Sequence, residues 1–178
     1  MEASRAGSRH VFLVGLSGVG KTTLAPHVAS LLNLPWLDTD ALVEGREGAS
    51  IAALFESHGE SYFRRVEAEV VDWILTQPAH VVAMGGGAPC QLGVMARLLN
   101  AGVVLCLDAN DDLLATRLSQ GAPRPLISRD APAIALRRLR VEREAVYAQA
   151  HATLNVEGHT LEEMAQWLAS RAQELLGD

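Results

Sequence analysis

The feature that most constrains this chain is the run Gly15-Leu16-Ser17-Gly18-Val19-Gly20-Lys21-Thr22, which matches the pattern GxxxxGK[ST]. A short apolar segment, Val11–Val14, comes directly before it, and a segment of helical period follows. Glycines let the backbone curl so that its N–H groups point at phosphate oxygens, and the helix N-terminus adds positive charge. The run therefore predicts a phosphate-binding loop (P-loop) between a strand and a helix. A glycine-rich turn that binds nothing is a poor alternative in this context.

The rest of the chain repeats this order of a short apolar run, a loop and a longer helical segment, which is typical of a parallel sheet built from βαβ units. We expect a three-layer α/β sandwich with a five-stranded parallel sheet, a P-loop NTPase fold of the nucleoside monophosphate kinase-like type. The predicted strands are 11–14, 34–37, 81–84, 103–107 and 153–156. The predicted helices are 21–32, 51–58, 60–76, 90–100, 111–119, 132–150 and 161–176.

The domain organisation is simple, because 178 residues suit one compact core. We expect a disordered tail over residues 1–9 and a single domain over 10–178. The tail has no apolar core of a secretion signal, and no stretch approaches the 18 or so apolar residues of a membrane span. The segment 119–130, with one glycine and two prolines, is long enough to predict a lid.

The charge balance, 15 Lys+Arg against 21 Asp+Glu, gives a net charge of −6 and argues against nucleic acid or an anionic membrane as a partner. Cys90 and Cys106 show no metal-binding or CxxC spacing, which suits a reducing cytoplasm. We expect a cytoplasmic monomer that acts on small molecules.

A P-loop leaves the phosphate acceptor open, and two carboxylates after the second predicted strand address it. Lys21 reaches the β- and γ-phosphates in such loops, and the Thr22 hydroxyl binds Mg²⁺. Asp38 and Asp40 stand at the carboxyl end of a strand, where open α/β sheets bind ligands. One carboxylate near the metal and one near the acceptor hydroxyl would serve phosphoryl transfer. The alternative is a helix N-cap pair with solvent-facing acids.

Two further patterns are open to a structural or a functional interpretation. Glu60, Arg64 and Glu67 share one helix face, which fixes the direction of Arg64 but is equally compatible with a surface ion-pair ladder. The triple glycine 85–87 follows a strand directly, so a ligand can approach the main chain there, although a plain tight turn is the alternative.

Arg143 interrupts an apolar helical stripe formed by Leu136, Leu139 and Val146. A buried guanidinium needs an anionic partner, and its planar fork suits a carboxylate. The alternative is an arginine that extends to the surface. Arg124, in the predicted lid, can swing onto a transferring phosphate or remain a surface arginine.

Taken together, these residues resemble the shikimate kinase family from Val11 to about Val156. The resemblance rests on Asp38-Thr39-Asp40 (DxD), Gly59-Glu60 with Phe63-Arg64 and Glu67 (GExxFRxxE), Gly85-Gly86-Gly87, Arg124-Pro125-Leu126 (RPL) and Glu142-Arg143 with Tyr147 (ERxxxY). The chain departs from the family pattern at Ala145, where proline is usual, and after the triple glycine at Ala88-Pro89-Cys90.

The resemblance implies transfer of the γ-phosphoryl of ATP to the 3-hydroxyl of shikimate, with Mg²⁺ as cofactor, in chorismate and aromatic amino acid biosynthesis. The implied catalytic residues are Lys21, Asp40 and Arg124. The implied metal ligands are Thr22 and Asp38. The residues implied for ATP are Gly18, Val19, Gly20, Lys21, Thr22, Thr23, Arg117, Arg124 and Pro125. Those implied for shikimate are Asp40, Arg64, Glu67, Gly85, Gly86, Gly87 and Arg143.

Two other functions stay open from the sequence. A gluconate-type or other small-molecule kinase shares the P-loop, but it does not require Arg64 and Arg143 beside a triple glycine. A nucleotide-binding module without turnover is the second, and the presence of Lys21, Asp38, Asp40 and Arg124 together counts against it.

Overall fold

The computed structural model describes residues 9–120, 125–127 and 131–177. Its sheet has five strands in the order β2-β3-β1-β4-β5, and every neighbouring pair is parallel. The strands are β1 (His10–Val14), β2 (Trp36–Asp38), β3 (Val81–Ala83), β4 (Gly102–Asp108) and β5 (Ala152–Asn155). The α/β fold and its parallel five-stranded sheet are therefore confirmed, with strand ends shifted by one or two residues.

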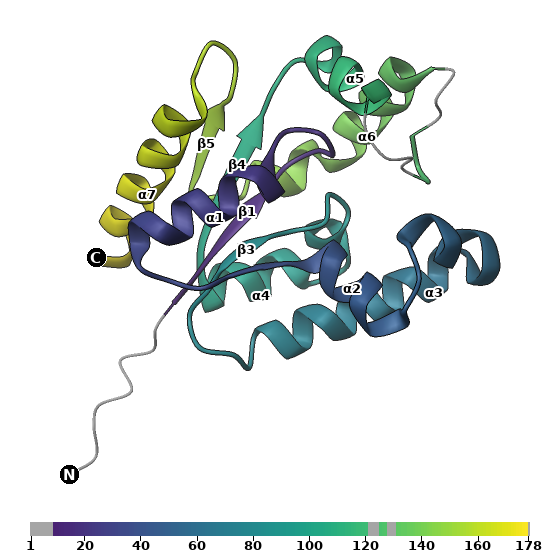
Figure 1. Cartoon of the computed structure of the whole chain (residues 1–178), viewed down its shortest axis with the longest axis horizontal. Coiled ribbons are helices and arrows are strands. Elements are labelled where there is room, and N and C mark those ends of the chain that lie inside the picture. Colours follow the sequence, from purple (N-terminus) through teal and green to yellow (C-terminus); the bar gives the residue numbers. More distant parts are fainter. Residues whose placement is uncertain (1–8, 121–124, 128–130, 178) are drawn as a thin grey trace.

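Helices cover both faces of this sheet. They are α1 (Lys21–Leu32), α2 (Thr39–Glu47), α3 (Ile51–Ile74), η1 (Ala88–Cys90, a 3₁₀ turn), α4 (Val94–Ala101), α5 (Asp111–Gln120), α6 (Pro132–Tyr147) and α7 (Leu161–Gly177). The helices α1 and α7 pack against each other on one side, whereas α3 and α4 lie on the other (Figure 1). None of the helices formed by the described residues combines the length and the apolar character that a membrane crossing requires.

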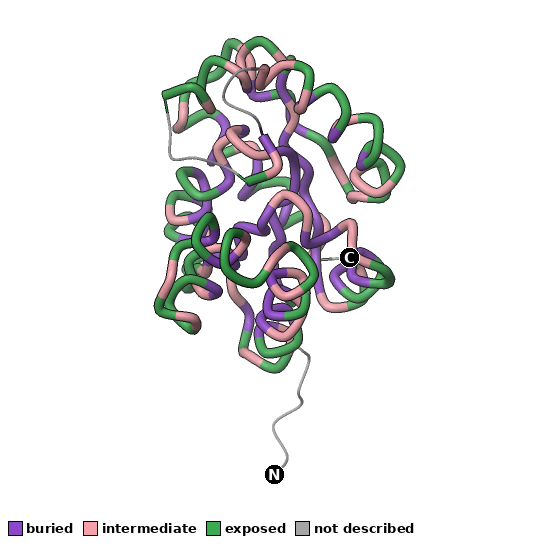
Figure 2. Tube along the Cα trace, turned by 90° about the vertical axis from the view of Figure 1, so that its right-hand side faces the viewer, coloured by how far each residue is buried: buried purple, intermediate pink, exposed green. Residues whose placement is uncertain are grey.

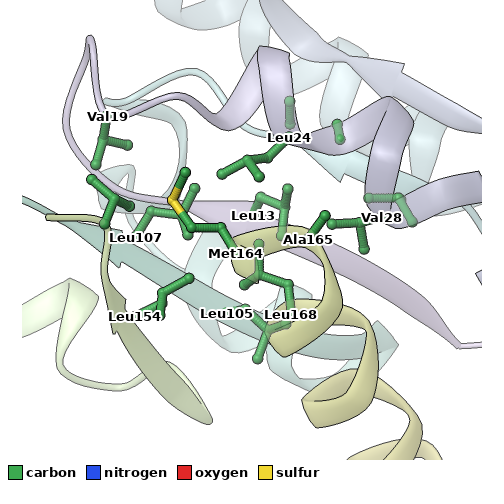
Figure 3. Close-up of a cluster of buried hydrophobic side chains, with 14 of the residues drawn as sticks. Leu13, Val19, Leu24, Val28, Leu105, Leu107, Leu154, Met164, Ala165 and Leu168 are labelled. Carbon is green, nitrogen blue, oxygen red and sulfur yellow. The ribbon is translucent and has the colours of Figure 1, made fainter. Parts of the chain in front are cut away.

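Strand alternation divides the core between the two faces. In β1, Val11 and Leu13 face the cluster beneath α1 and α7, while Phe12 and Val14 face the cluster beneath α3 and α4. Figure 3 shows the first cluster, in which leucines of β1 and β4 meet side chains of α1 and α7. Buried positions accordingly run through the middle of the chain trace and exposed ones lie on the outer sides of the helices (Figure 2). Because the central strand is buried on both faces, its carboxyl end is a rigid base for the P-loop.

The helix starts predicted at residues 51, 111 and 161 are confirmed. Ser50 Oγ accepts from Ala53 N at 3.2 Å, and Asn110 Oδ1 accepts from Leu113 N at 2.8 Å. Thr160 and Glu163 form a reciprocal capping box: Glu163 N donates to Thr160 Oγ1 at 3.2 Å, and Thr160 N donates to Glu163 Oε2 at 2.8 Å.

The predicted break between 51–58 and 60–76 is also confirmed. Gly59 interrupts α3 with φ 80° and ψ 173°, a conformation essentially confined to glycine. Two differences concern shorter elements. The helix α2 was not predicted, and the predicted helix 90–100 is replaced by η1 and α4 because Gly93 adopts φ 76° between them.

The predicted tail and lid extend over positions that the structure does not describe. Residues 1–8, 121–124 and 128–130, and with them Arg124, lie outside the described ranges. Their predicted roles are therefore untested.

Candidate active site

A polar pocket lies where the P-loop leaves the carboxyl end of β1. Its lining residues are Ser17, Gly18, Gly20, Lys21, Thr22, Thr23, Asp38, Asp40, Met84 and Gly86. Gly18 and Gly20 adopt φ values of 84° and 107°, which side chains other than glycine rarely accept. The Lys21 ammonium is nearly buried and donates to the carbonyl oxygens of Gly15 and Leu16 at 2.8 and 2.9 Å. The curve of the loop thus holds a cation beside the space that this pocket encloses. We name this space the phosphate pocket.

Asp38 connects the P-loop to the start of α2. Its Oδ2 accepts from Thr22 Oγ1 at 2.6 Å, while its Oδ1 accepts from the amides of Asp40 and Ala41 at 2.9 and 3.1 Å. Asp38 is therefore a helix N-cap, as the structural alternative supposed, and at the same time a buried partner of the loop threonine. Asp40, in the first turn of α2, is consequently fixed relative to the P-loop.

A second pocket, which we name the acceptor pocket, adjoins the first. Its lining residues are Ser17, Asp40, Ile51, Phe55, Phe63, Arg64, Glu67, Gly86, Gly87, Pro125, Leu126, Ile127, Leu139 and Arg143. Ser17, Asp40 and Gly86 line both pockets. The two pockets are therefore continuous at these three residues, and Asp40 stands at the junction.

Arg64 lies over the triple-glycine turn. Its Nη1 donates to Glu67 Oε2 at 2.7 Å, and its Nη2 and Nε reach Glu60 Oε1 at 3.2 and 3.3 Å. A Cβ atom at Gly87 would lie 2.5 Å from Arg64 Nη1, so only glycine leaves room for the guanidinium. The predicted ion-pair ladder of Glu60, Arg64 and Glu67 therefore exists. Its Glu67 end is buried, and this ion pair directs the Arg64 side chain into the acceptor pocket.

Glu67 is almost completely buried, with 1% of its surface exposed. Burial raises the pKa of this carboxyl above its usual value; Arg64 opposes the shift, and the Asp40 carboxylate adds to it. Glu67 Oε1 and Asp40 Oδ1 both approach the side of Gly85 that a Cβ would occupy, at 2.8 and 2.5 Å from the position of that atom. The first glycine of the turn is therefore needed to fit both acids.

Arg143 is an interior residue with 7% of its surface exposed, so it does not extend to the surface. A Cβ at Gly86 would lie 3.2 Å from its Nη1, which places the guanidinium against the middle of the turn. No carboxylate among residues 9–120, 125–127 and 131–177 forms an ion pair with it. Among the residues that the structure describes, the buried Arg143 guanidinium is therefore not paired with a carboxylate, and such a cation favours the binding of an anionic ligand.

Comparison with known proteins identifies the family. The sequence model described as "Shikimate kinase" matches residues 17–173. The chain belongs to the shikimate kinase family. Curated shikimate kinases agree: that of Caldanaerobacter subterraneus subsp. tengcongensis is 37% identical over 89% of this chain and 92% of its own. Another, from Bradyrhizobium diazoefficiens, is 38% identical over 85% of this chain and 73% of its own.

Solved structures extend this result. Shikimate kinase from Acinetobacter baumannii in complex with shikimate has a TM-score of 0.89 at 33% identity, with 93% of each chain covered. A gluconokinase from Sinorhizobium meliloti has a TM-score of 0.61 at 16% identity and shows the shared fold alone. As a member of the shikimate kinase family, the chain is a phosphotransferase.

Two further residues that the family resemblance implied in ATP binding lie at different pockets. Arg117 Nη1 donates to the carbonyl oxygens of Gly18 and Val19 at 3.3 Å each, next to the phosphate pocket. Pro125 lines the acceptor pocket in this structure, so its assignment to the nucleotide stays a prediction.

Sequence reasoning missed several contacts of this family member. Thr39 Oγ1 accepts from Gly85 N at 2.7 Å, and Gln91 Nε2 donates to Glu67 Oε2 at 2.7 Å. Tyr147, which the resemblance included without a role, donates to Gly86 O at 2.5 Å. Burial raises the pKa of Tyr147, so its hydroxyl stays a donor. A single-residue signal for Thr39 or Gln91 does not exist, because each contact joins segments distant in the sequence.

Proposed function

We propose that this enzyme transfers the γ-phosphoryl group of ATP to the 3-hydroxyl of shikimate, giving shikimate 3-phosphate and ADP in the chorismate route to aromatic amino acids. The observation that carries the proposal is the convergence of two arginines, Arg64 and Arg143, on a pocket that shares residues with the P-loop. A phosphate acceptor that carries a carboxylate suits these two guanidinium groups. The apolar wall of Ile51, Phe55 and Leu139 suits the carbon face of a ring.

The phosphate side of the reaction is assigned to the P-loop. Amides of Gly18, Val19, Gly20 and Lys21 bind the phosphate oxygens, and the Lys21 ammonium stabilises charge that develops on the transferred group. Thr23 also lines this pocket. These residues are held before the nucleotide arrives, because the loop is closed around Lys21.

Thr22 and Asp38 are the residues that would hold Mg²⁺. They offer a hydroxyl and a carboxylate oxygen 2.6 Å apart, both of the hard type that Mg²⁺ prefers. Two protein oxygens fit this ion, which usually keeps several waters and binds substrate phosphates. When bound, the ion would neutralise negative charge on the phosphates during transfer. No group of three His, Cys, Asp or Glu side chains within the described part of the chain offers a competing metal site.

Asp40 receives the acceptor hydroxyl in this proposal. It is the charged residue that lines both pockets, and its place in the first turn of α2 is fixed by the Asp38 cap. A carboxylate there orients the 3-hydroxyl toward the γ-phosphate and accepts its proton. Arg124 of the lid would neutralise the transferred phosphate, and Arg117 and Pro125 would contact the nucleotide. We place the enzyme in the cytoplasm as a monomer, without nucleic acid or membrane partners.

A coupled ADP-release assay tests this function. We expect Mg²⁺-dependent turnover with shikimate and at most weak turnover with quinate or gluconate, and Lys21→Met provides the inactive control. Turnover with gluconate at a rate equal to that with shikimate would favour a gluconate-type or other small-molecule kinase. ATP binding without turnover on any of the three acceptors would favour the non-catalytic module.

A further inference from the structure

Gln91 connects the end of the triple-glycine segment to the buried acid of the acceptor pocket. Its Nε2 donates to Glu67 Oε2 at 2.7 Å, although Gln91 follows η1 and Glu67 lies in α3. The backbone of Gln91 is held on both sides, since its N–H donates to Ala88 O at 3.2 Å and its carbonyl accepts from Val94 N at 3.1 Å. The amide side chain is therefore presented to Glu67 from a fixed position four residues after Gly87.

Glu67 depends on such a donor. A carboxylate with 1% exposure has lost its water, and it is stable in the charged form only with donors at its oxygens. Its Oε2 receives Arg64 Nη1 and Gln91 Nε2, both at 2.7 Å. Its Oε1 faces the side of Gly85 from which Asp40 also approaches, so a second negative charge is close. Gln91 stabilises the charged form against this neighbour.

The direction of Arg64 follows from the charge on Glu67. The other partner of Arg64 is Glu60, whose side chain is 51% exposed and therefore a weak and water-screened anchor. Glu67 is 1% exposed and sits at 2.7 Å, so it fixes the guanidinium over Gly87. Because the Gln91 amide is neutral, it supports Glu67 without adding a cation that would replace Arg64 as its partner.

We infer that Gln91 is a positioning residue of the acceptor site, which acts through Glu67 to hold the Arg64 fork where an acceptor carboxylate binds. The inference rests on the proposed function, because it assigns Gln91 to the affinity for shikimate. Gln91 does not line the phosphate pocket, so ATP binding is independent of it.

The substitution Gln91→Met tests the role, since methionine keeps the length of the side chain and removes the donor. A hydrogen bond to a charged group of this kind is worth about tenfold or more in an equilibrium constant. We expect KM for shikimate at pH 7.5 to rise about tenfold. The value of kcat should fall by less than about threefold, and KM for ATP should not change. The matched control is Gln77→Met, because Gln77 is also half-buried and also donates its amide, at 3.3 Å to Trp73 O, but lies away from both pockets.

The pH profile separates positioning from a general loss of structure. The titratable groups that face Glu67 are Arg64 on its own helix, Asp40 from α2 and the thiol of Cys90 from η1, whose pKa burial raises so that it stays neutral. Without the Gln91 donor the pKa of Glu67 rises further, so the acid limb of kcat/KM for shikimate should move to higher pH in Gln91→Met. In Gln91→Glu, kcat/KM for shikimate should fall further than in Gln91→Met at pH 8, because two carboxylates then face each other. The difference should diminish as the pH falls, because one proton shared by the two carboxyl groups provides a hydrogen-bond donor to Glu67 again.

A parent enzyme that fails to phosphorylate shikimate overturns the proposed function itself. If the parent is active and Gln91→Met keeps its KM for shikimate and its acid limb, only the role of Gln91 is overturned. Parallel increases in KM for ATP and KM for shikimate in Gln91→Met also contradict positioning through Glu67. So does a decrease in kcat/KM for shikimate in Gln91→Glu that does not depend on pH.

Discussion

Arg143→Met is the change that separates acceptor binding from stability most sharply. Arg143 is 7% exposed, so a contact from its guanidinium to an acceptor carboxylate is shielded from water. Loss of one partner from a buried, hydrogen-bonded charge pair costs about 2–5 kcal/mol. At about 1.4 kcal/mol for each factor of ten, Kd for shikimate should rise from roughly 30-fold to a few thousand-fold. We expect the lower part of this range, because Arg64 remains in the pocket.

The ligand-free enzyme should respond in the opposite direction. Arg143 has no carboxylate partner within the portion of the chain that the structure describes, and the stripe of Leu136 and Leu139 lies on the same helix. Methionine fills the same space with an apolar, adaptable side chain and removes a buried charge. The melting temperature without ligand should therefore stay constant or rise. The Tyr147 hydrogen bond to Gly86 O, at 2.5 Å, remains to support the turn.

Isothermal titration with shikimate and thermal melting without ligand measure the two effects. Arg138→Met is the matched control, because Arg138 lies on the same helix with a side chain that is 65% exposed and paired with Glu142. It should change neither quantity. Normal shikimate affinity in Arg143→Met would refute the carboxylate clamp, and unfolding would show that Arg143 stabilises the fold. Weakened ATP binding would contradict its assignment to the acceptor pocket.

Three further changes have distinct expected results. Asp40→Asn should lower kcat for shikimate at least a hundredfold while Kd for ATP stays within threefold, since general-base catalysis contributes about 10²–10⁴-fold; a collapse of ATP affinity would instead assign Asp40 to the metal. Gly87→Ala should weaken shikimate binding with little loss in melting temperature, because its Cβ, 2.5 Å from Nη1, displaces the flexible end of Arg64. Burial, with a smaller effect of His80, lowers the pKa of His10 below 6.5, so the folded state disfavours the proton. The free energy of unfolding should consequently fall as pH drops below about 6.5, and His10→Asn should flatten that dependence in urea titrations.

The fold was predictable where one residue type determines the local backbone. Gly59 was expected to end a helix, and the structure breaks α3 there because glycine tolerates a φ of 80°. The helix α2 escaped prediction because it is short and mostly polar, with only Thr39 and Val43 buried. Its stability comes from the Asp38 cap and from packing on α3, and packing cannot be seen in a linear pattern.

The site was predictable as a set of residue types and not as a set of contacts. The inward position of Arg143 followed from its conflict with an apolar stripe, a signal that needs only helical periodicity. For Asp38, the two alternatives were posed as exclusive, yet its two oxygens serve the Thr22 hydroxyl and the helix cap separately. Gln91 could not be found, because an amide in a loop has no periodic or charge pattern that points to a partner 24 positions away.

The break at Gly59 has a consequence for engineering new acceptors. The segment before it carries the apolar wall residues Ile51 and Phe55, whereas the segment after it carries Arg64 and Glu67. The two segments can therefore be diversified separately: a library over residues 51–58 alters the shape offered to the carbon skeleton and leaves the carboxylate anchor in place. Variants from such a library should differ in their preference among carboxylic acids of different size and saturation. The residues assigned to ATP binding stay unchanged in all of them.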